Sequence, residues 1–531
     1  MNFNLHRFRR IVFPLFGVLI VLAGYFSLKL RFSFDFEQFF PQGDPDLVFF
    51  QDFIKNFESD DNFLLVGVES KNTPNGVFDQ SFLQRFDSLT QKSLDLPYVV
   101  DNQSLTKVKL PVKSPFGILP VPAMHVEDTS YYAEDRVKIL SDQRFVRNLI
   151  SEDGKSLVLF LKTKDKITLE ESDTLIHALD SLINPLHFDA HHYLGRANFQ
   201  KELVWMEKRE VAVSSGVAAI LVAFIIVILF RRWKTVALAL TSIGLSMFLF
   251  FGLLGALGRE LSAMAALYPV LMVIIGTSDF IHMLSKYIDE LRRGHTQEEA
   301  IWFTMKEIGL ATLMTAVTTA VGFATLLTSR IVPIQEFGVN AAIGVMVAYV
   351  TVLLFTTAVF SFFSVNDLIL LRGSSTRIEQ FMEWVYRVTK RRARLIGLIA
   401  TGILLVCVYG ISKIKTNYSI EDNMPIGEKV TEDFYFFEKV FSGFRPLEYA
   451  VFAQNGHRAD DYAVMQQMNK LEEHLRTIPA IHSITSPTMI YKSISQMSNG
   501  NRNAAYLFPT DSLQFADYQI FADKVDRKSV V

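Results

Sequence analysis

Seven stretches of the chain are apolar for long enough to cross a bilayer as helices, since a span needs roughly 20 mostly apolar residues. Arg7, Arg9 and Arg10 precede the first stretch, as they would in a cleaved signal peptide. No small-x-small cleavage site follows, so a retained anchor is the favoured interpretation. The pattern predicts spans at residues 11–28, 211–230, 236–257, 262–284, 308–328, 338–363 and 395–411.

Lysine and arginine are distributed unequally between the segments that separate these stretches. The N-terminus and the segments after spans two, four and six are basic, whereas the two short opposite loops hold only Arg259 and Arg330. Because basic loops remain in the cytoplasm, this asymmetry predicts a cytoplasmic N-terminus. Residues 29–210 and 412–531 are then expected on the outer side of the membrane.

The first outer segment alternates between strand-like and helix-like patterns. Leaving aside a long excursion from 106 to 155, the order is βαββαβ, which is that of the split ferredoxin-like unit. The predicted fold class is therefore an α-helical membrane bundle with α+β ferredoxin-like outer (porter) domains. The strands are expected at 62–69, 98–105, 156–162 and 192–194, and the helices at 78–92 and 169–182.

The chain resembles itself at a spacing of about 384 residues. Each copy begins with a span and continues into an outer domain, and parallel repeats of this kind are typical of transporters. The residues that keep register are Lys29, Glu37, Pro41, Gly43, Phe50, Phe53, Lys55 and Phe57 in the first copy and Lys413, Glu421, Pro425, Gly427, Phe434, Phe437, Lys439 and Phe441 in the second.

The second outer segment repeats only part of the first. It predicts strands at 447–453 and 481–486 and helices at 460–476 and 511–525. We therefore expect an incomplete second porter domain, and a full protein of roughly 770 residues, twice the repeat period. The expected organisation is a cytoplasmic N-terminus with the first span (1–28), a first porter domain (29–210), a bundle of spans two to six (211–363), a cytoplasmic amphipathic linker (364–394), a seventh span (395–411) and the second porter domain (412–531).

Composition fits a chain that combines membrane spans with aqueous domains. Half of the 531 residues are hydrophobic, and the net charge of −2 gives no reason to expect a nucleic-acid partner. The single cysteine, Cys407, excludes an intrachain disulfide and a cysteine-based zinc site. The His191-His192 pair has no further ligand at metal-binding spacing, so no metal is expected. The chain has no phosphate-binding GxxxxGK[ST] loop and no evident nucleophile–base set, so neither ATP use nor a catalytic site is expected.

Asp279 lies near the inner end of the fourth apolar stretch. An ionisable group in a span costs roughly 2.5–3.5 kcal/mol on insertion scales, and such groups usually serve proton relay, ion coupling or substrate pairing. The alternative is an interfacial acid paired with Lys286, seven residues further on. Possible supporting polar groups, each of which can instead serve ordinary helix packing, are Thr277, Ser278, His282, Thr315, Thr318 and Thr319.

A set of short motifs surrounds Asp279. These are Gly276-Thr-Ser-Asp279-Phe-Ile-His282, Ser285-Lys-Tyr287, Glu290-Leu-Arg-Arg-Gly294, the threonines 315–319 and Gly322-Phe323. Together they resemble the resistance–nodulation–division (RND) superfamily, specifically its MMPL-like lipid exporter branch, and spans two to six are similar to the sterol-sensing arrangement. Many relatives carry paired acids in span four, whereas here Thr277 and Ser278 precede a single Asp279.

The resemblance implies a secondary active transporter of the bacterial inner membrane, with periplasmic porter domains, rather than an enzyme. Its energy source would be the proton gradient, with no cofactor, and Asp279 would be the proton relay. Its partner would be a lipid or another hydrophobic small molecule, and the chain would act as an oligomer or with a missing C-terminal half. One alternative is a sterol-sensing-type receptor or lipid-binding protein without proton coupling. Another is a protein-export accessory of the same superfamily.

Overall fold

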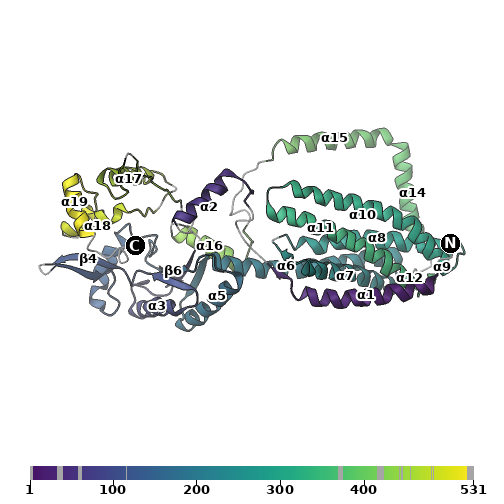
Figure 1. The fold of residues 1–531 in the computed structure, drawn as a ribbon, viewed down its shortest axis with the longest axis horizontal. Coiled ribbons are helices and arrows are strands. Elements are labelled where there is room, and N and C mark those ends of the chain that lie inside the picture. Colours follow the sequence, from purple (N-terminus) through teal and green to yellow (C-terminus); the bar gives the residue numbers. More distant parts are fainter. Residues whose placement is uncertain are drawn as a thin grey trace. The chain divides into compact units, whose positions relative to one another are not determined.

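The computed structural model describes residues 4–32, 40–57, 62–114, 117–262, 264–368, 375–414, 424–441, 443, 447–454, 456–479, 481, 483–500 and 502–522. The chain divides into two compact units (Figure 1). Unit 1 comprises Met1–Gln51 and Leu203–Asn423, and unit 2 comprises Asp52–Glu202 and Met424–Val531. Each unit therefore draws on both copies of the sequence repeat.

Unit 1 is built mainly of apolar helices. Seven helical stretches in the described part are long and apolar enough to cross a membrane, which confirms the number of spans that the hydropathy pattern predicts. Two of these stretches contain π-helical turns, at Thr304–Ile308 and Val352–Thr356. The helices are α1 (Leu5–Ser27), α6 (Arg196–Phe230, which begins in unit 2), α7 (Trp233–Ala256), α8 (Leu267–Arg292), α9 (Gln297–Phe303), α10 (Gly309–Ala324), α11 (Val332–Thr351), α12 (Thr357–Phe360), α13 (Val365–Leu368), α14 (Ser375–Arg391) and α15 (Ala393–Ile411).

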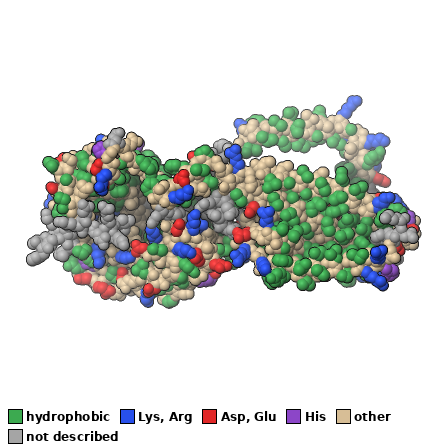
Figure 2. All heavy atoms as spheres, viewed as in Figure 1, with side chains coloured by type: hydrophobic (Ala, Val, Ile, Leu, Met, Phe, Trp, Pro, Cys, Tyr) green, Lys and Arg blue, Asp and Glu red, His purple; other side chains and the backbone are tan. Residues whose placement is uncertain are grey.

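The outside of unit 1 has the character of a lipid-facing surface. Hydrophobic side chains cover its helices over most of their length, and lysine and arginine side chains lie near the helix ends (Figure 2). Inside, α1 packs closely on α7, and a short parallel pair joins β1 (Arg31–Phe32) to β8 (Glu260–Leu261). All residues of α15 are exposed.

Unit 2 contains a four-stranded antiparallel sheet in the order β3-β6-β2-β7. The strands are β2 (Phe63–Glu69), β3 (Val99–Gln103), β6 (Ser156–Thr163) and β7 (Ala190–Gly195), and the connecting helices are α3 (Gln80–Lys92) and α5 (Leu169–Ile183). Their sequence positions agree with those predicted for the first outer segment. The excursion forms the hairpin of β4 (Lys109–Ser114) and β5 (Gly117–Pro122), followed by α4 (Tyr132–Leu140).

The two faces of this sheet are covered by different parts of the chain. Alternate side chains of β2, Leu64, Val66 and Val68, are fully buried in one hydrophobic core with α3 and α5. On the other face, α16 (Lys429–Val440) from the second copy packs on β7. A Cβ atom on Gly67 would lie 2.6 Å from Cε1 of Phe436, so the absence of a side chain at Gly67 permits this close approach.

The helices of the second copy follow the repeat. The first residues of α2 (Pro45–Phe57) and α16 are separated by the repeat spacing found in the sequence, and α17 (Tyr462–Leu475) corresponds to α3. α19 (Ser512–Ala522) corresponds to α4. A further helix, α18 (Thr488–Ser498), was not predicted.

The prediction of strands at 447–453 and 481–486 is wrong for the residues described in those ranges, which are irregular. A strand is stable only when its N–H and C=O groups pair with a neighbour. No strand pairs with either segment within the described part of the chain. The helices α17 and α18 of the second copy are joined by a buried ion pair, in which Lys492 Nζ donates to Oε2 of Glu472 over 2.8 Å.

Candidate functional site

Asp279 is buried within the helical bundle. It lies in α8, is 6% exposed, and is preceded by buried Gly276 and Thr277. A Cβ atom on Gly276 would lie 3.2 Å from Cγ1 of Ile243, so α8 packs tightly on α7 one turn before Asp279. Phe280, the next residue, is fully buried in a core that also contains Ile243 and Met283. The carboxyl group is therefore surrounded by apolar packing.

The carboxyl group of Asp279 lacks a partner in the described structure. Its Oδ2 atom is buried without a hydrogen bond, and no hydrogen bond or ion pair to Asp279 is found among the described residues. Buried polar groups in proteins are nearly always paired, and an exception calls for an explanation such as an unbound proton, ion or ligand partner. The burial of this oxygen without a hydrogen-bond partner is the strongest sign that the carboxyl group has a functional role rather than a packing role.

Two irregular helix turns lie next to α8. The π-helical turns Thr304–Ile308 and Val352–Thr356 both contact α8. Tyr349 lies in α11, one turn before the second of them. The Tyr349 hydroxyl donates to the carbonyl oxygen of Gly309 over 3.1 Å. Single π-helical turns inside α-helices are frequent at functional sites, because they disturb the regular hydrogen bonding.

The interpretation of Asp279 as one half of an ion pair with Lys286 is wrong. Lys286 Nζ lies 3.0 Å from Oε1 of Glu290 and 2.5 Å from Oε2 of Glu307. Glu290 is also bound by Arg293 and by His295. Lys286 therefore belongs to an ionic cluster at the end of α8, which leaves Asp279 without a basic partner in the described structure.

The other polar residues of α8 singled out from the sequence are placed differently. Thr277 is buried, and its hydroxyl oxygen has no hydrogen-bond partner in the described structure. Ser278 and His282 are exposed, and neither is hydrogen-bonded to Asp279. Thr277 and Asp279 are thus buried polar positions two residues apart in α8, and the i+3 spacing does not give a hydrogen bond between His282 and the carboxyl group in the described structure.

The three threonines of the fifth span also remain apart from Asp279. Thr315, Thr318 and Thr319 are exposed or half-buried, and each hydroxyl donates to a carbonyl oxygen of its own helix, α10. Threonine hydroxyls in helices commonly bond back to the carbonyl four residues earlier. Within the described structure these threonines therefore play a local role.

Other buried polar side chains of the bundle were not predicted either. Ser242 in α7, Asn340 in α11 and Thr356 in a π-helical turn each have a buried oxygen without a hydrogen-bond partner in the described structure. The Asn340 amide nitrogen does donate to the Tyr268 hydroxyl over 3.1 Å. A serine, asparagine or threonine inside an apolar stretch is a weak sequence signal, because such residues also occur at ordinary helix contacts.

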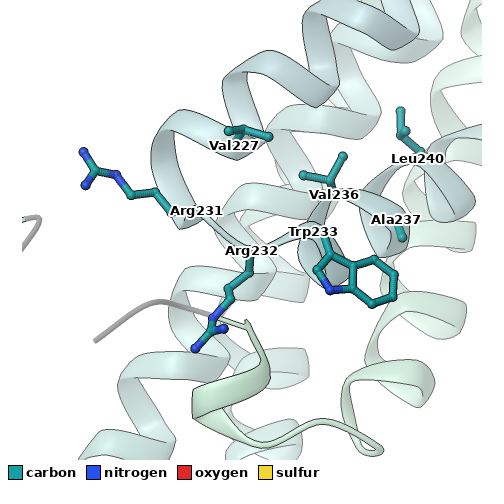
Figure 3. A pocket seen from close by; sticks show the side chains of 7 residues that line it. All are labelled: Val227, Arg231, Arg232, Trp233, Val236, Ala237 and Leu240. Atoms are coloured by element: carbon teal, nitrogen blue, oxygen red, sulfur yellow. The ribbon is translucent and has the colours of Figure 1, made fainter. Parts of the chain in front are cut away.

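A separate groove lies where α6 ends and α7 begins (Figure 3). Its volume is about 520 Å³, and Figure 3 shows Arg231 and Arg232 at the turn between the helices, with Trp233 beside them. Apolar walls with a basic and aromatic rim are what a bundle presents at the edge of a bilayer. None of the residues of α8 lines it, so the groove is distinct from the Asp279 site. The lining residues are Val227, Arg231, Arg232, Trp233, Val236, Ala237 and Leu240.

Metal ligands are not grouped in the described part of the chain. No cluster of three or more His, Cys, Asp or Glu side chains suited to a metal ion occurs there. His191 and His192 lie on β7, where their rings make hydrogen bonds with neighbouring side chains.

The spans and the buried carboxyl group define a membrane protein of many helices that carries an ionisable group inside its bundle. The sequence matches the model of the MMPL family over residues 89–396, more than half of the chain, and the chain belongs to that family. A membrane protein of Methanocaldococcus jannaschii is 21% identical over 345 residues, which are 63% of this chain and 86% of that relative. The resemblance to the MMPL family that was inferred from the motifs is thereby confirmed. Membership indicates an RND-type transporter of hydrophobic substrates rather than an enzyme.

Proposed function

We propose that this protein uses the proton gradient to export lipids or other hydrophobic molecules from the inner membrane of a bacterium. The observation that carries the proposal is the buried Asp279 carboxyl group, whose Oδ2 atom has no partner in the described structure. Family membership supports the transport of hydrophobic substrates.

Proton coupling follows from the energetics of an ionisable group in an apolar bundle. The packing energy of α8 depends on whether Asp279 is charged or neutral, because a buried charge must find a polar partner or water. Proton binding and release can therefore favour two different arrangements of α8. The π-helical turns at Thr304–Ile308 and Val352–Thr356 provide irregular backbone beside α8 where such a change requires little distortion.

The outer segments would move the substrate. We propose that the β3-β6-β2-β7 sheet with α3 and α5 is a ferredoxin-like porter domain on the periplasmic side, and that the N-terminus is cytoplasmic. The βαββαβ order of the elements supports the first statement, and the asymmetry of lysine and arginine supports the second.

The proposal is tested in proteoliposomes of phosphatidylethanolamine and phosphatidylglycerol that contain a fluorescent NBD-labelled phospholipid. A pH gradient is imposed, and transfer of the probe to external albumin is measured. Asp279→Asn should abolish gradient-driven transfer, because the amide cannot exchange a proton. Asp289→Asn is the matched control, since Asp289 is an exposed acid on the same helix, and it should transfer at the wild-type rate.

The sterol-sensing-type receptor remains the second candidate, and the same assay separates the two. A receptor or lipid-binding protein would retain its lipid affinity after Asp279→Asn and would show no gradient-driven transfer even as the wild type. Gradient-driven transfer by Asp279→Asn at the wild-type rate would refute proton coupling through Asp279.

A further inference from the structure

The geometry points to a second protonation site, which lies in unit 2 rather than in the spans. Binding of one proton at this site stabilises the packing of α16 on the face of the β-sheet. The site consists of Glu69 of β2, His192 of β7 and Asp433 of α16. Nothing in this inference depends on Asp279 or on the direction of transport.

His192 is held between two carboxylates. Its Nε2 atom lies 2.7 Å from Oε1 of Glu69, and its Nδ1 atom lies 2.8 Å from Oδ1 of Asp433. The side chains of Glu69 and Asp433 are 9% and 2% exposed, so water competes little for either carboxylate. The two partners come from opposite ends of the sequence, and His192 is the group that joins them.

The two contacts require two N–H donors on the His192 ring, and a neutral histidine has one. A neutral imidazole has one N–H donor and one lone pair, whereas the imidazolium ion has two donors. Ionised carboxylates only accept hydrogen bonds. Both short contacts are therefore satisfied when the His192 ring carries a proton on each nitrogen, which is one proton more than a neutral histidine has. Without that proton, one ring nitrogen directs its lone pair at a buried carboxylate. This holds for either tautomer, because the lone pair faces Glu69 in one and Asp433 in the other. Packing α16 on the sheet then places two buried carboxylates against a ring with one N–H donor, and this weakens the attachment of α16.

Packing around the ring makes the position of α16 sensitive to this proton. Phe436 of α16 stacks on the His192 ring with 3.9 Å between the ring centroids. Gly67, the register partner of His192 on β2, leaves room for the Phe436 ring. The second carboxylate oxygen of Asp433 accepts the backbone N–H of Tyr193 over 3.1 Å. α16 is thus seated on the sheet directly over the ionisable cluster.

The surrounding charged groups do not replace the missing proton. From the β2 side, Lys71 lies 2.9 Å from Oε2 of Glu69 but is 59% exposed. From α16, Lys429 is 3.4 Å from Nε2 of His191 and lies over the Tyr193 ring. From α5, Asp180 accepts the Tyr193 hydroxyl, and Glu202 of α6 lies within electrostatic range of Lys429 and Asp433. None of these groups donates to Asp433 Oδ1, so His192 is its donor in the described structure.

The neighbouring histidine provides a natural contrast. Burial, with the Lys429 charge, lowers the pKa of His191. The ring of His191 lies against a cation, Lys429, whereas the ring of His192 lies between two carboxylates, although the two histidines are adjacent in the chain. A pair of variants, one at each histidine, separates the proposed site from a general effect of acid on the strand.

The test measures hydrogen–deuterium exchange of the full-length protein in lipid nanodiscs at about pH 5.5 and about pH 8.5, on either side of the range in which histidine usually titrates. Protection factors, which correct for the intrinsic pH dependence of exchange, are compared for peptides that cover α16 and α3. In the wild type, the protection of α16 should fall at least about tenfold at the higher pH, the factor that corresponds to the loss of one hydrogen bond to a charged group. α3, on the other face of the sheet, should keep its protection.

Three variants decide the role of the cluster. His192→Gln should remove the pH dependence and leave α16 weakly protected at both pH values. Asp433→Asn should also remove it but leave α16 protected at both, because the asparagine amide can donate to a neutral imidazole and still accept from Tyr193. His191→Gln should behave as the wild type. The inference is overturned if wild-type α16 shows equal protection at both pH values, if Asp433→Asn keeps the pH dependence, or if His191→Gln loses it.

Discussion

Replacing Gly252 by alanine should loosen the packing of α1 on α7. A Cβ atom at Gly252 would overlap Cα and Cβ of Ala23 and lie 2.9 Å from the Ala23 carbonyl oxygen. The neighbouring Gly255 is equally constrained, since its Cβ atom would overlap the carbonyl oxygen of Phe26. The atoms in the way belong largely to backbone, so relief requires the two helices to move apart.

The magnitude follows from two opposed effects. Alanine is favoured over glycine in a helix by up to about 1 kcal/mol. Overpacking of a tight contact usually costs about 1–3 kcal/mol of stability. If the helices move apart by about 0.5–1 Å, the atoms that line the contact lose about a quarter to a half of their van der Waals attraction. We expect a net loss of about 1–2 kcal/mol, which corresponds to a fall in unfolding temperature of about 2–8 °C.

Gly244→Ala is the matched control, because Gly244 lies in the same helix and its Cβ atom would meet nothing within 4 Å. Thermal unfolding of both variants in one detergent is followed by intrinsic fluorescence. Gly244→Ala should unfold at or slightly above the wild-type temperature. If Gly252→Ala unfolds at the same temperature as Gly244→Ala, the close packing of α1 on α7 does not contribute to stability as we argue.

Two further predictions concern unit 2. Burial alone would raise the pKa of Glu472, but hydrogen bonds from Lys492, Arg476 and Thr488 outweigh it and lower that pKa from 4.5 to about 2. Since the pKa is lower in the folded state, Glu472 stabilises the fold above about pH 4.5 and loses this effect as the pH falls toward 2. Glu472→Gln should lower the unfolding temperature at pH 7 and flatten its fall below pH 4.5, and an unchanged acid profile would contradict this assignment. In a Cys407→Ser background, Ser130→Cys should react with an impermeant thiol reagent added from outside intact cells, and labelling only from the cytoplasmic side would refute the proposed topology.

The broad architecture was accessible from the sequence because it depends on patterns that repeat. Seven apolar stretches predicted seven spans, and the apolar run at 62–69 predicted the strand that the structure has as β2. The repeat spacing put Phe50 in register with Phe434, and these two residues lie in the corresponding helices α2 and α16. Each of these signals extends over many residues, so no single side chain decides it.

The features that define the sites depend on contacts between distant residues. Nothing local in the sequence indicates that His192 would meet Glu69 and Asp433, which lie 123 and 241 residues away. Of the two partners of Lys286, Glu290 lies four residues away on the same helix, whereas Glu307 lies on another helix and could not be inferred from local spacing. The strands predicted at 447–453 and 481–486 failed for the same reason, since strand propensity requires a neighbouring strand that the pattern itself does not identify.

The most direct test of proton coupling through Asp279 is a measurement of proton movement with the pH-sensitive dye pyranine sealed inside proteoliposomes. Addition of albumin to vesicles that hold the NBD-labelled phospholipid should start probe transfer and, with it, proton flux down an imposed gradient. The account predicts that both signals appear together in the wild type and in Asp289→Asn, and that both are absent in Asp279→Asn. Probe transfer by Asp279→Asn with wild-type proton flux would contradict the account.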